Sequence, residues 1–230
     1  QVYRCLKLFS KVDGKRIFVA GNHDLWRLQG DSWEFYNNRL PEIASDCGFH
    51  FLDSGPFIAD NIGFVGNIGW YDYSYRRGKY SISEKSYKRK TFQGAVWNDV
   101  NYARWGRSDP DMAHQFEREL QQQINSVKDS VSRIIVVTHH VPFRECVIYK
   151  DKLPWDFFSA FMGSVGLGEI CINEPLVTHV FFGHTHFEFF EEIKGVQAVC
   201  SPIGYLTDPP NDLREYAQSR LRIIELPEEQ

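Results

Sequence analysis

Residues 16–24 read RIFVAGNHD, and this stretch decides the fold. The apolar run 16–20 is short and turn residues follow it at once, a pattern typical of a buried β-strand. The polar tetrapeptide Gly21-Asn22-His23-Asp24 therefore lies at the carboxyl end of a strand. In open α/β sheets ligands bind beyond that end of the strands, so the stretch predicts an α/β fold with its site here.

Two further apolar runs end in the same way. Residues 134–138 (IIVVT) lead into His139 and His140, and residues 177–182 (VTHVFF) lead into residues 183–186 (GHTH). Five of the eight histidines lie in these strand-end clusters, which random scatter would rarely produce. Neutral imidazole and an amide oxygen suit Mn, Fe, Co, Ni or Zn better than Ca. The clusters therefore indicate a site for one of these metals.

The glycines before Asn22 and His184 are expected to let the backbone turn sharply. Two histidines at i and i+2 point to opposite faces of a strand, but in a loop that leaves the strand they can converge on neighbouring metal ions. His50, His114 and His179 lie outside the clusters, and we interpret them as structural. His140 is expected to pack or to contact substrate rather than to bind metal.

The remaining segments predict a layered α/β sandwich, because apolar strands lie on both sides of a long helix. That helix is expected to have Asp109 as its N-cap and Pro110 in its first turn, with an apolar stripe of Met112, Phe116, Leu120, Ile124 and Val127. A helix tail is predicted over 1–11, and a second helical stretch is opened by the capping box 31–34, divided at Pro41 and ended by Gly48. Hairpins are predicted over 56–60/62–69 and 187–193/196–200, and a last strand over 221–226.

Length and composition set the broad class. The 230 residues fit one domain, and the formal net charge of −4 argues against a whole-domain nucleic-acid footprint. No apolar run approaches the roughly 18–20 residues of a membrane span. The five cysteines are scattered and form no C-x-x-C pair, so they predict reduced core thiols in a cytoplasmic setting.

Residues 70–109 show no sustained period and predict an insertion near the site. Tyrosines alternate with Arg and Lys between Tyr71 and Lys90. A solvated surface insert is the favoured interpretation; a lid over an anionic substrate and a nucleic-acid surface are the alternatives. Trp97, Tyr102 and Trp105 are expected to anchor the insert to the core.

The three motifs together resemble the later motifs of the calcineurin-like binuclear metallophosphoesterases. The order Gly-Asn-His-Asp, then His139 after a strand, then Gly-His-Thr-His is similar to that family over residues 15–226. The resemblance implies a four-layer α/β/β/α sandwich and hydrolysis of phosphomonoesters or phosphodiesters with two divalent metals (Mn, Fe, Zn, Ni or Co).

The resemblance also implies a role for each residue. Asn22, His139 and His184 would bind one metal, and His186 would bind the second. His23 would stabilise or protonate the leaving oxygen, and Asp24 would orient His23 and raise its basicity. Two such metals about 3.5–4 Å apart would neutralise the phosphate charge and acidify a bridging water.

One departure from the family pattern lies at the front of the chain. The family begins with Asp-x-His and continues with Gly-Asp-x-x-Asp, and neither motif is present; the one Gly-Asp, Gly30-Asp31, follows the Asn-His-Asp motif. We therefore expect residues 1–230 to be an N-terminally incomplete metallophosphoesterase domain whose first strands are missing. The other interpretation is a degenerate, metal-poor relative.

Two competing functions stay open. A nuclease of the same superfamily is favoured by the basic insert and opposed by the acidic net charge. A non-catalytic interaction module would be expected to have lost the catalytic histidine, whereas His23 and Asp24 are both present. A phosphate-ester substrate is therefore the expected partner, with nucleic acid less favoured, no membrane, and no indication of oligomeric state.

The missing motifs give a first prediction. If an N-terminal segment precedes Gln1, the parent gene should encode Asp-x-His and Gly-Asp-x-x-Asp upstream of it. Sequencing the gene and its transcript checks this. A coding region that starts at Gln1 would contradict the prediction and favour the degenerate relative.

Overall fold

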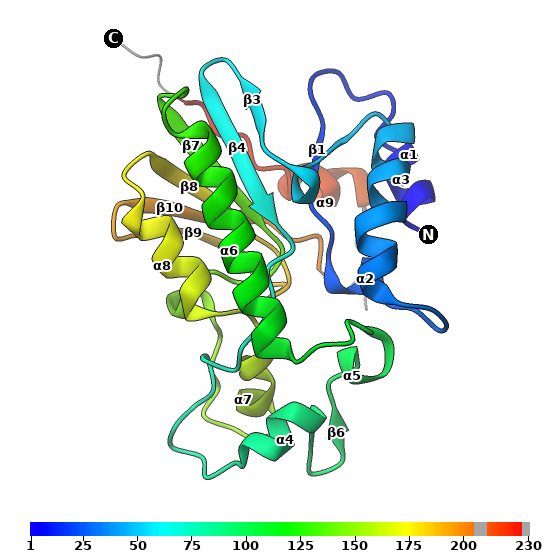
Figure 1. Cartoon of the computed structure of the whole chain (residues 1–230), viewed down its shortest axis with the longest axis vertical. Coiled ribbons are helices and arrows are strands. Elements are labelled where there is room, and N and C mark those ends of the chain that lie inside the picture. Colours follow the sequence, from blue (N-terminus) through cyan, green and yellow to red (C-terminus); the bar gives the residue numbers. More distant parts are fainter. Residues whose placement is uncertain (205–210, 227–230) are drawn as a thin grey trace.

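A computed structural model describes residues 1–204 and 211–226. Its main sheet has the strand order β3-β4-β7-β8-β10-β9 (Figure 1). The four inner strands run parallel, and the edge strands β3 and β9 are antiparallel to their neighbours. The strands are β3 Phe57–Ala59, β4 Ile62–Asn67, β7 Arg133–Thr138, β8 Val177–Phe181, β9 Phe189–Ile193 and β10 Val196–Cys200.

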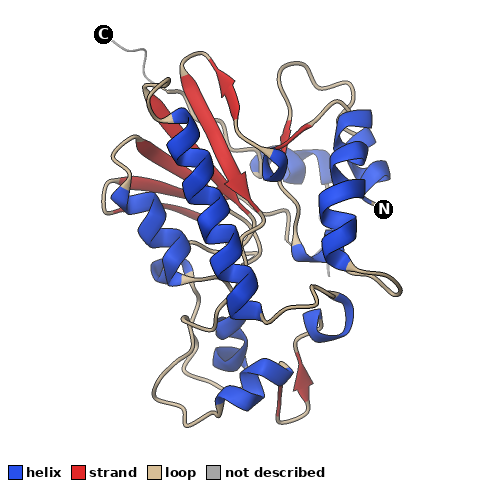
Figure 2. Cartoon of the chain, in the orientation of Figure 1, coloured by secondary structure: helices blue, strands red, loops and turns tan. Residues whose placement is uncertain are grey.

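The predicted four-layer α/β/β/α sandwich is confirmed, with a second sheet that is small in the described part of the chain. That sheet pairs β1 (Ile17–Phe18) in parallel with β2 (His50–Phe51). Helices α6 (Asp109–Val127) and α8 (Val165–Asn173) cover the outer face of the main sheet (Figure 2). Beyond the small sheet lie α1 Val2–Lys7, α2 Ser32–Glu34 and α3 Leu40–Asp46.

The long helix forms as its periodicity predicts. All five residues of its apolar stripe are buried. Leu120, Ile124 and Val127 pack in the hydrophobic cluster of the main sheet, with Val65, Val136 and Val180. Met112 and Phe116 belong to the cluster nearer the small sheet. The start differs by one residue. Ser108 is the N-cap and accepts a hydrogen bond from the Asp111 N–H, so Asp109 is already helical.

The helical stretch after Asp31 is nearly continuous. The Asp31 carboxylate caps it by accepting the N–H groups of Trp33 and Glu34. Pro41 lies in the first turn of α3, and the preceding turn, Phe35–Arg39, widens into a π-helix. Because proline has no N–H to donate, it removes a helical hydrogen bond without ending the helix here. Gly48 ends it with a φ of +74°.

Both predicted hairpins are confirmed, and the last predicted strand is wrong. Asp60 and Asn61 turn the first hairpin with positive φ values. Residues 221–226 form no strand; they follow the short helix α9 (Leu213–Ser219), and Leu221 and Ile223 are 71% and 84% exposed. An apolar run forms a strand only where a partner edge and a buried face are provided.

The insert 70–109 is not a solvated surface segment. Its rings Trp70, Tyr71, Tyr73, Tyr75 and Tyr87 are at most 3% exposed. Its regular elements are short: α4 Glu84–Arg89, β5 Thr91–Phe92, β6 Ala95–Val96 and α5 Asp99–Tyr102. Against it pack α7 Trp155–Phe158 and the 3₁₀ turn Ser159–Phe161, through ring contacts such as Tyr87–Phe157. Most rings of the insert therefore belong to the hydrophobic cluster that also contains Leu25, Tyr36 and Phe116.

Three other sequence-level expectations concern the whole chain. All five cysteines are unpaired, and four of them are buried. Over the described residues, no helix is both long enough and apolar enough to cross a bilayer. Of the histidines outside the clusters, His114 is exposed on α6, His50 bonds to the Gly55 carbonyl, and His179 contacts Thr178.

A buried carboxyl, Asp53, joins the two sheets. It lies in the 3₁₀ turn Leu52–Ser54 after β2 and accepts hydrogen bonds from the Tyr36 hydroxyl and, at 2.7 Å, from the Ile68 N–H beyond β4. Its Oδ2 atom is enclosed and has no partner. Burial raises the pKa of Asp53 to about 7, and these hydrogen bonds oppose the rise only in part.

Asp53 gives a stability prediction. Because its pKa is higher in the folded than in the unfolded protein, folding favours the protonated carboxyl. The stabilisation is complete below about pH 4 and is lost as the pH rises towards about 7, with a slope of at most ~1.4 kcal/mol per pH unit. Asp53→Asn should remove this slope from the free energy of unfolding, measured by urea denaturation at several pH values.

The exposed hairpin residue Asp60 provides the matched control. Asp60→Asn should leave the pH slope of the wild type unchanged. Parallel slopes for wild type and Asp53→Asn between pH 5 and pH 7 would contradict a proton taken up by Asp53 on folding.

Candidate active site

Three strand ends bring Asn22, His139 and His184 together. The His139 Nε2 lies 3.0 Å from the Asn22 Oδ1 and 3.0 Å from the His184 Nδ1. Asn22 starts the 3₁₀ turn Asn22–Leu25 after β1, His139 follows β7, and His184 follows β8. The strand ends belong to two sheets, β1 to the small sheet and β7 and β8 to the main sheet, and the three atoms converge where these ends meet.

The donor set fits a divalent cation. Adjacent ligands of an octahedral ion with bonds near 2.1 Å lie about 3.0 Å apart, as these atoms do. Burial lowers the pKa of His139 and of His184, and in His139 the neighbouring histidines add to the effect. Both imidazoles are therefore neutral near pH 7, the form that binds metal.

The residues for a second ion are fewer. His186 lies at the exposed rim of the site. Its partial burial there and the nearby His23 lower its pKa. Within residues 1–204 and 211–226, no three His, Cys, Asp or Glu side chains gather as a metal site would require. This agrees with the absence of the two carboxylate motifs from the sequence.

The backbone around the site is shaped by close contacts. His184 and His186 themselves adopt left-handed conformations, with φ of +66° and +57°, so the turn does not rest on the glycines as expected. Gly21 and Gly183 instead lie close to the His139 ring. A Cβ atom on Gly21 would lie 2.9 Å from the His139 ring, and one on Gly183 would lie 3.4 Å from it. Gly21 therefore makes room for His139, whereas a side chain at Gly183 would only touch the ring.

The His23 ring packs on an aromatic side chain. Its imidazole stacks on Trp26, with ring centroids 3.9 Å apart. Asp24 accepts the Gly21 N–H at 2.8 Å and so closes the 3₁₀ turn. Burial raises the pKa of Asp24, and the hydrogen bond from Gly21 opposes the rise. Among the described residues no hydrogen bond joins Asp24 to His23, so the orienting role expected of Asp24 stays a prediction, and Trp26 packs directly on the His23 ring.

Asp99, a buried residue that no sequence pattern selects, organises the site. Its Oδ1 accepts the Asn22 side-chain amide at 2.9 Å and the Trp26 indole at 2.7 Å. Its Oδ2 accepts the Trp97 indole at 2.7 Å and the Tyr71 hydroxyl at 3.1 Å. Asp99 thus turns the Asn22 Oδ1 towards His139 and fixes the ring under His23.

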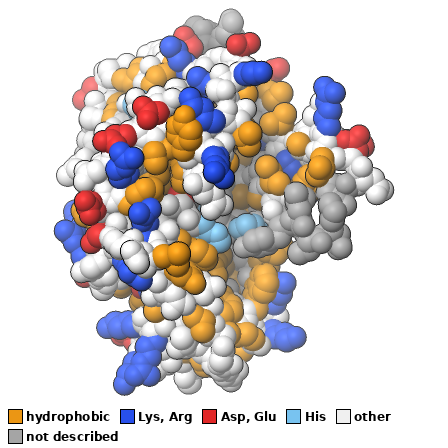
Figure 3. Space-filling model, turned by 90° about the vertical axis from the view of Figure 1, so that its right-hand side faces the viewer, with side chains coloured by type: hydrophobic (Ala, Val, Ile, Leu, Met, Phe, Trp, Pro, Cys, Tyr) orange, Lys and Arg blue, Asp and Glu red, His pale blue; other side chains and the backbone are white. Residues whose placement is uncertain are grey.

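The converging side chains line a cavity of about 290 Å³. Figure 3 shows histidine side chains in a hollow, with hydrophobic side chains beside them. Every predicted site residue is among the residues that line the cavity, which are Val19, Gly21, Asn22, His23, Asp24, Trp97, His139, His184 and His186. Trp97 therefore belongs to the site as well as to the core.

His140 lies behind this cavity and is not among its lining residues. It is fully buried, its Nδ1 contacts the Ile68 carbonyl at 3.0 Å, and its ring packs on Trp70 and His184. The expectation that His140 packs rather than binds metal therefore agrees with its position.

Comparison with known proteins gives the same family. The family model of the calcineurin-like phosphoesterases matches residues 2–188. A relative, an uncharacterized protein of Acanthamoeba polyphaga mimivirus, is 21% identical over 92% of this chain and 76% of its own length. The crystal structure of a phosphopantetheinyl hydrolase from Mycobacterium tuberculosis superposes with a TM-score of 0.74, at 17% identity, over 90% of this chain and 81% of its own.

The fold and the converging side chains define an α/β/β/α protein with a polar strand-end site. The chain belongs to the calcineurin-like phosphoesterase family. Membership supports phosphoester hydrolysis as the general activity, and the family as a whole uses divalent metal ions.

Asp99 gives a prediction for metal binding. Asp99→Asn would replace a carboxylate that accepts four hydrogen bonds with an amide whose N–H groups face donors. Asn22 would lose its orientation, and the affinity for Mn²⁺ should fall by about 10- to 100-fold. Isothermal titration calorimetry on the full-length protein measures this.

Asp109 is the matched control, because it is a second buried carboxylate that anchors the insert. It accepts the Trp70 indole and pairs with Lys90, and it does not contact the site residues. Asp109→Asn should lower stability and leave the Mn²⁺ affinity of the folded protein unchanged. Equal losses of affinity in both variants would mean that Asp99 acts only through folding.

Proposed function

We propose that this protein hydrolyses phosphomonoesters or phosphodiesters with bound divalent metal ions. The observation that supports this most directly is the 3.0 Å convergence of the Asn22 oxygen and the His139 and His184 nitrogens in a cavity that His23 also lines. Mn, Fe, Co, Ni and Zn are the candidates, because neutral nitrogen ligands favour them over Ca.

In this proposal Asn22, His139 and His184 hold one ion, and His186 contributes to a second. When bound, the ions supply positive charge against the phosphate and lower the pKa of a coordinated water. His23 is the proton donor to the leaving oxygen, since its imidazole is exposed in the cavity, has no metal-binding role in this proposal and packs on Trp26. Asp99 acts as a positioning residue for Asn22 and Trp26.

The second ion needs carboxylate ligands that the described residues 1–204 and 211–226 do not gather at this site. The Asp-x-His and Gly-Asp-x-x-Asp motifs of the family are the expected source. A working enzyme with two ions therefore depends on those motifs in the complete gene product. A cytoplasmic setting, which the unpaired cysteines support, is also part of the proposal.

Nuclease activity is less well supported than the sequence alone indicated. Much of the positive charge of the insert is already paired: Arg77 and Lys79 contact Asp151, Lys88 pairs with Glu84, and Lys90 is buried against Asp109. Four tyrosines of the insert are buried instead of offering ring faces to bases: Tyr71, Tyr73, Tyr75 and Tyr87. Nuclease activity therefore ranks second, and single-stranded DNA is the substrate that tests it.

His23 gives the prediction for catalysis. His23→Ala should lower kcat on bis(nitrophenyl) phosphate by about 100-fold or more and change the Mn²⁺ affinity little, because the residue donates a proton and binds no ion. Steady-state kinetics and calorimetry on the full-length protein measure the two effects.

His114→Ala is the control, because His114 is exposed on α6 and lies outside the cavity. It should match the wild type in kcat and in Mn²⁺ affinity. Absence of turnover by the wild type with each of the five metals would reject the enzyme and favour the interaction module.

A further inference from the structure

A second, larger cavity adjoins the polar one. Its volume is about 450 Å³, within the range of about 300–1,000 Å³ that is usual for small-molecule sites. Trp97, His184 and His186 line both cavities, so the two form one continuous depression. The other lining residues are Ile148, Trp155, Phe158, Ser159, Met162, Thr185 and Phe187.

The second cavity is aromatic and uncharged. Four of its lining residues are Trp or Phe, and the described lining residues include no Asp, Glu, Lys or Arg. The Ser159 and Thr185 hydroxyls and the two shared histidines are its polar groups. An ionised ligand group would lose its hydration here without a charged partner, whereas a neutral ring would gain contacts with ring faces.

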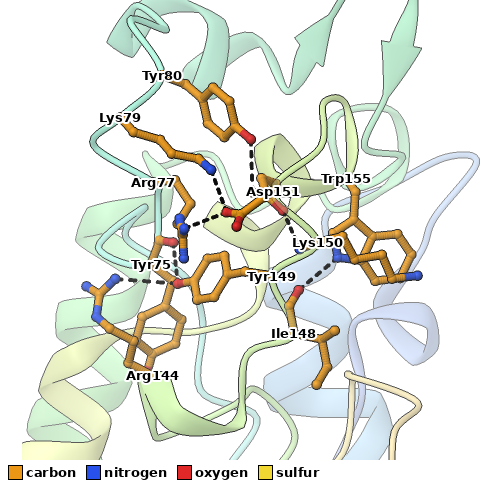
Figure 4. A network of polar contacts seen from close by, with 11 residues as sticks. Tyr75, Arg77, Lys79, Tyr80, Arg144, Ile148, Tyr149, Lys150, Asp151 and Trp155 are labelled. Carbon is orange, nitrogen blue, oxygen red and sulfur yellow. Dashed lines mark hydrogen bonds and ion pairs between the residues drawn. The ribbon is translucent and has the colours of Figure 1, made fainter.

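The wall that carries Trp155 is fixed by the insert. The Trp155 indole donates to the Ile148 carbonyl at 2.8 Å, and the Lys150 ammonium lies 3.4 Å from the centroid of the Trp155 rings (Figure 4). The neighbouring Asp151 accepts hydrogen bonds from Arg77 and Lys79. These contacts hold the loop 147–155 in place, so the wall of the cavity is formed without a ligand.

Two rings of this wall are only partly covered by the protein. Trp155 is 36% exposed and Phe187 is 39% exposed, and their ring centroids lie 6.2 Å apart, nearly at right angles. Trp97, by contrast, has partners within the protein: its indole N–H donates to Asp99 and its ring stacks on Phe161. A flat group that enters beside Trp97 would cover the exposed ring surfaces of Trp155 and Phe187.

We propose that the substrate is a phosphoester whose organic group carries a neutral aromatic ring, and that this ring binds in the cavity between Trp97, Trp155 and Phe187. The inference rests on the proposed function, because it places the phosphate in the adjoining polar cavity. Trp97, which borders both cavities, lies where the phosphate and the ring of one substrate would be joined. The cavity thus determines which esters are bound, and the strand-end side chains act on the phosphate.

Binding of non-hydrolysable phosphonates tests the ring site separately from turnover. Benzylphosphonate, methylphosphonate and cyclohexylmethylphosphonate share the charged group and differ only in what enters the second cavity. For the Mn²⁺-loaded, full-length wild type, calorimetry should give a Kd for benzylphosphonate about 10-fold lower than for methylphosphonate. The cyclohexyl compound should bind less tightly than the benzyl compound.

Trp155→Ala and Phe187→Ala should each reduce the benzyl preference by about 5-fold and leave the Kd of methylphosphonate unchanged. Both side chains are partly exposed, so neither truncation empties the core. Phe190→Ala is the matched control: Phe190 is 52% exposed on β9 and lines neither cavity, so its removal should leave all three Kd values unchanged.

Turnover of benzyl phosphate and methyl phosphate completes the test, since their leaving alcohols are of similar basicity. A higher kcat/KM for benzyl phosphate, lost in Trp155→Ala, supports the proposal. Equal binding of all three phosphonates would overturn the ring site and leave the proposed hydrolysis intact. Equal binding of the benzyl and cyclohexyl compounds would overturn the requirement for an aromatic ring. Failure of the wild type to bind any phosphonate or to hydrolyse any ester would overturn both proposals.

Discussion

The buried carboxylate of Asp99 is the interaction on which the geometry of the site depends. A buried charge is costly unless hydrogen bonds replace its hydration, and here four donors do so. Each donor is a side chain whose orientation matters to the site. The four donors are the Asn22 amide, the Trp26 indole under His23, the Trp97 indole between the two cavities and the Tyr71 hydroxyl of the insert. One carboxylate therefore sets several orientations at once.

This arrangement changes the meaning of the insert 70–109. An appendage could be removed without loss to the site, but this segment supplies both Asp99 and Trp97. Its second buried carboxylate, Asp109, anchors Trp70 and Lys90, and its basic residues Arg77 and Lys79 secure the loop that carries Trp155. Part of the charge that resembled a binding surface in the sequence is paired with acidic side chains of the protein itself.

The sequence predicts the fold well where a short local pattern decides it. Apolar runs that end in Asn, His and Gly located the three strand ends, and the stripe from Met112 to Val127 located the long helix. Asp99 could not be found in this way, because a lone acidic residue in an irregular segment belongs to no pattern. Its partner Asn22 is 77 residues away. The strand expected over 221–226 was wrong for a related reason, since pairing depends on an available edge.

The charge balance of the site gives Asp99 a further part in the chemistry. Asn22, His139 and His184 are all neutral donors, so a cation among them would keep its full charge towards a phosphate. The Asp99 carboxylate is hydrogen-bonded directly behind Asn22, and its field raises the pKa of His184 against the larger effect of burial. A buried anion at this position stabilises positive charge at the site without occupying a ligand position. Asp99 would therefore offset a bound cation from behind, whereas none of Asn22, His139 and His184 would place a negative charge on the side that faces a phosphate.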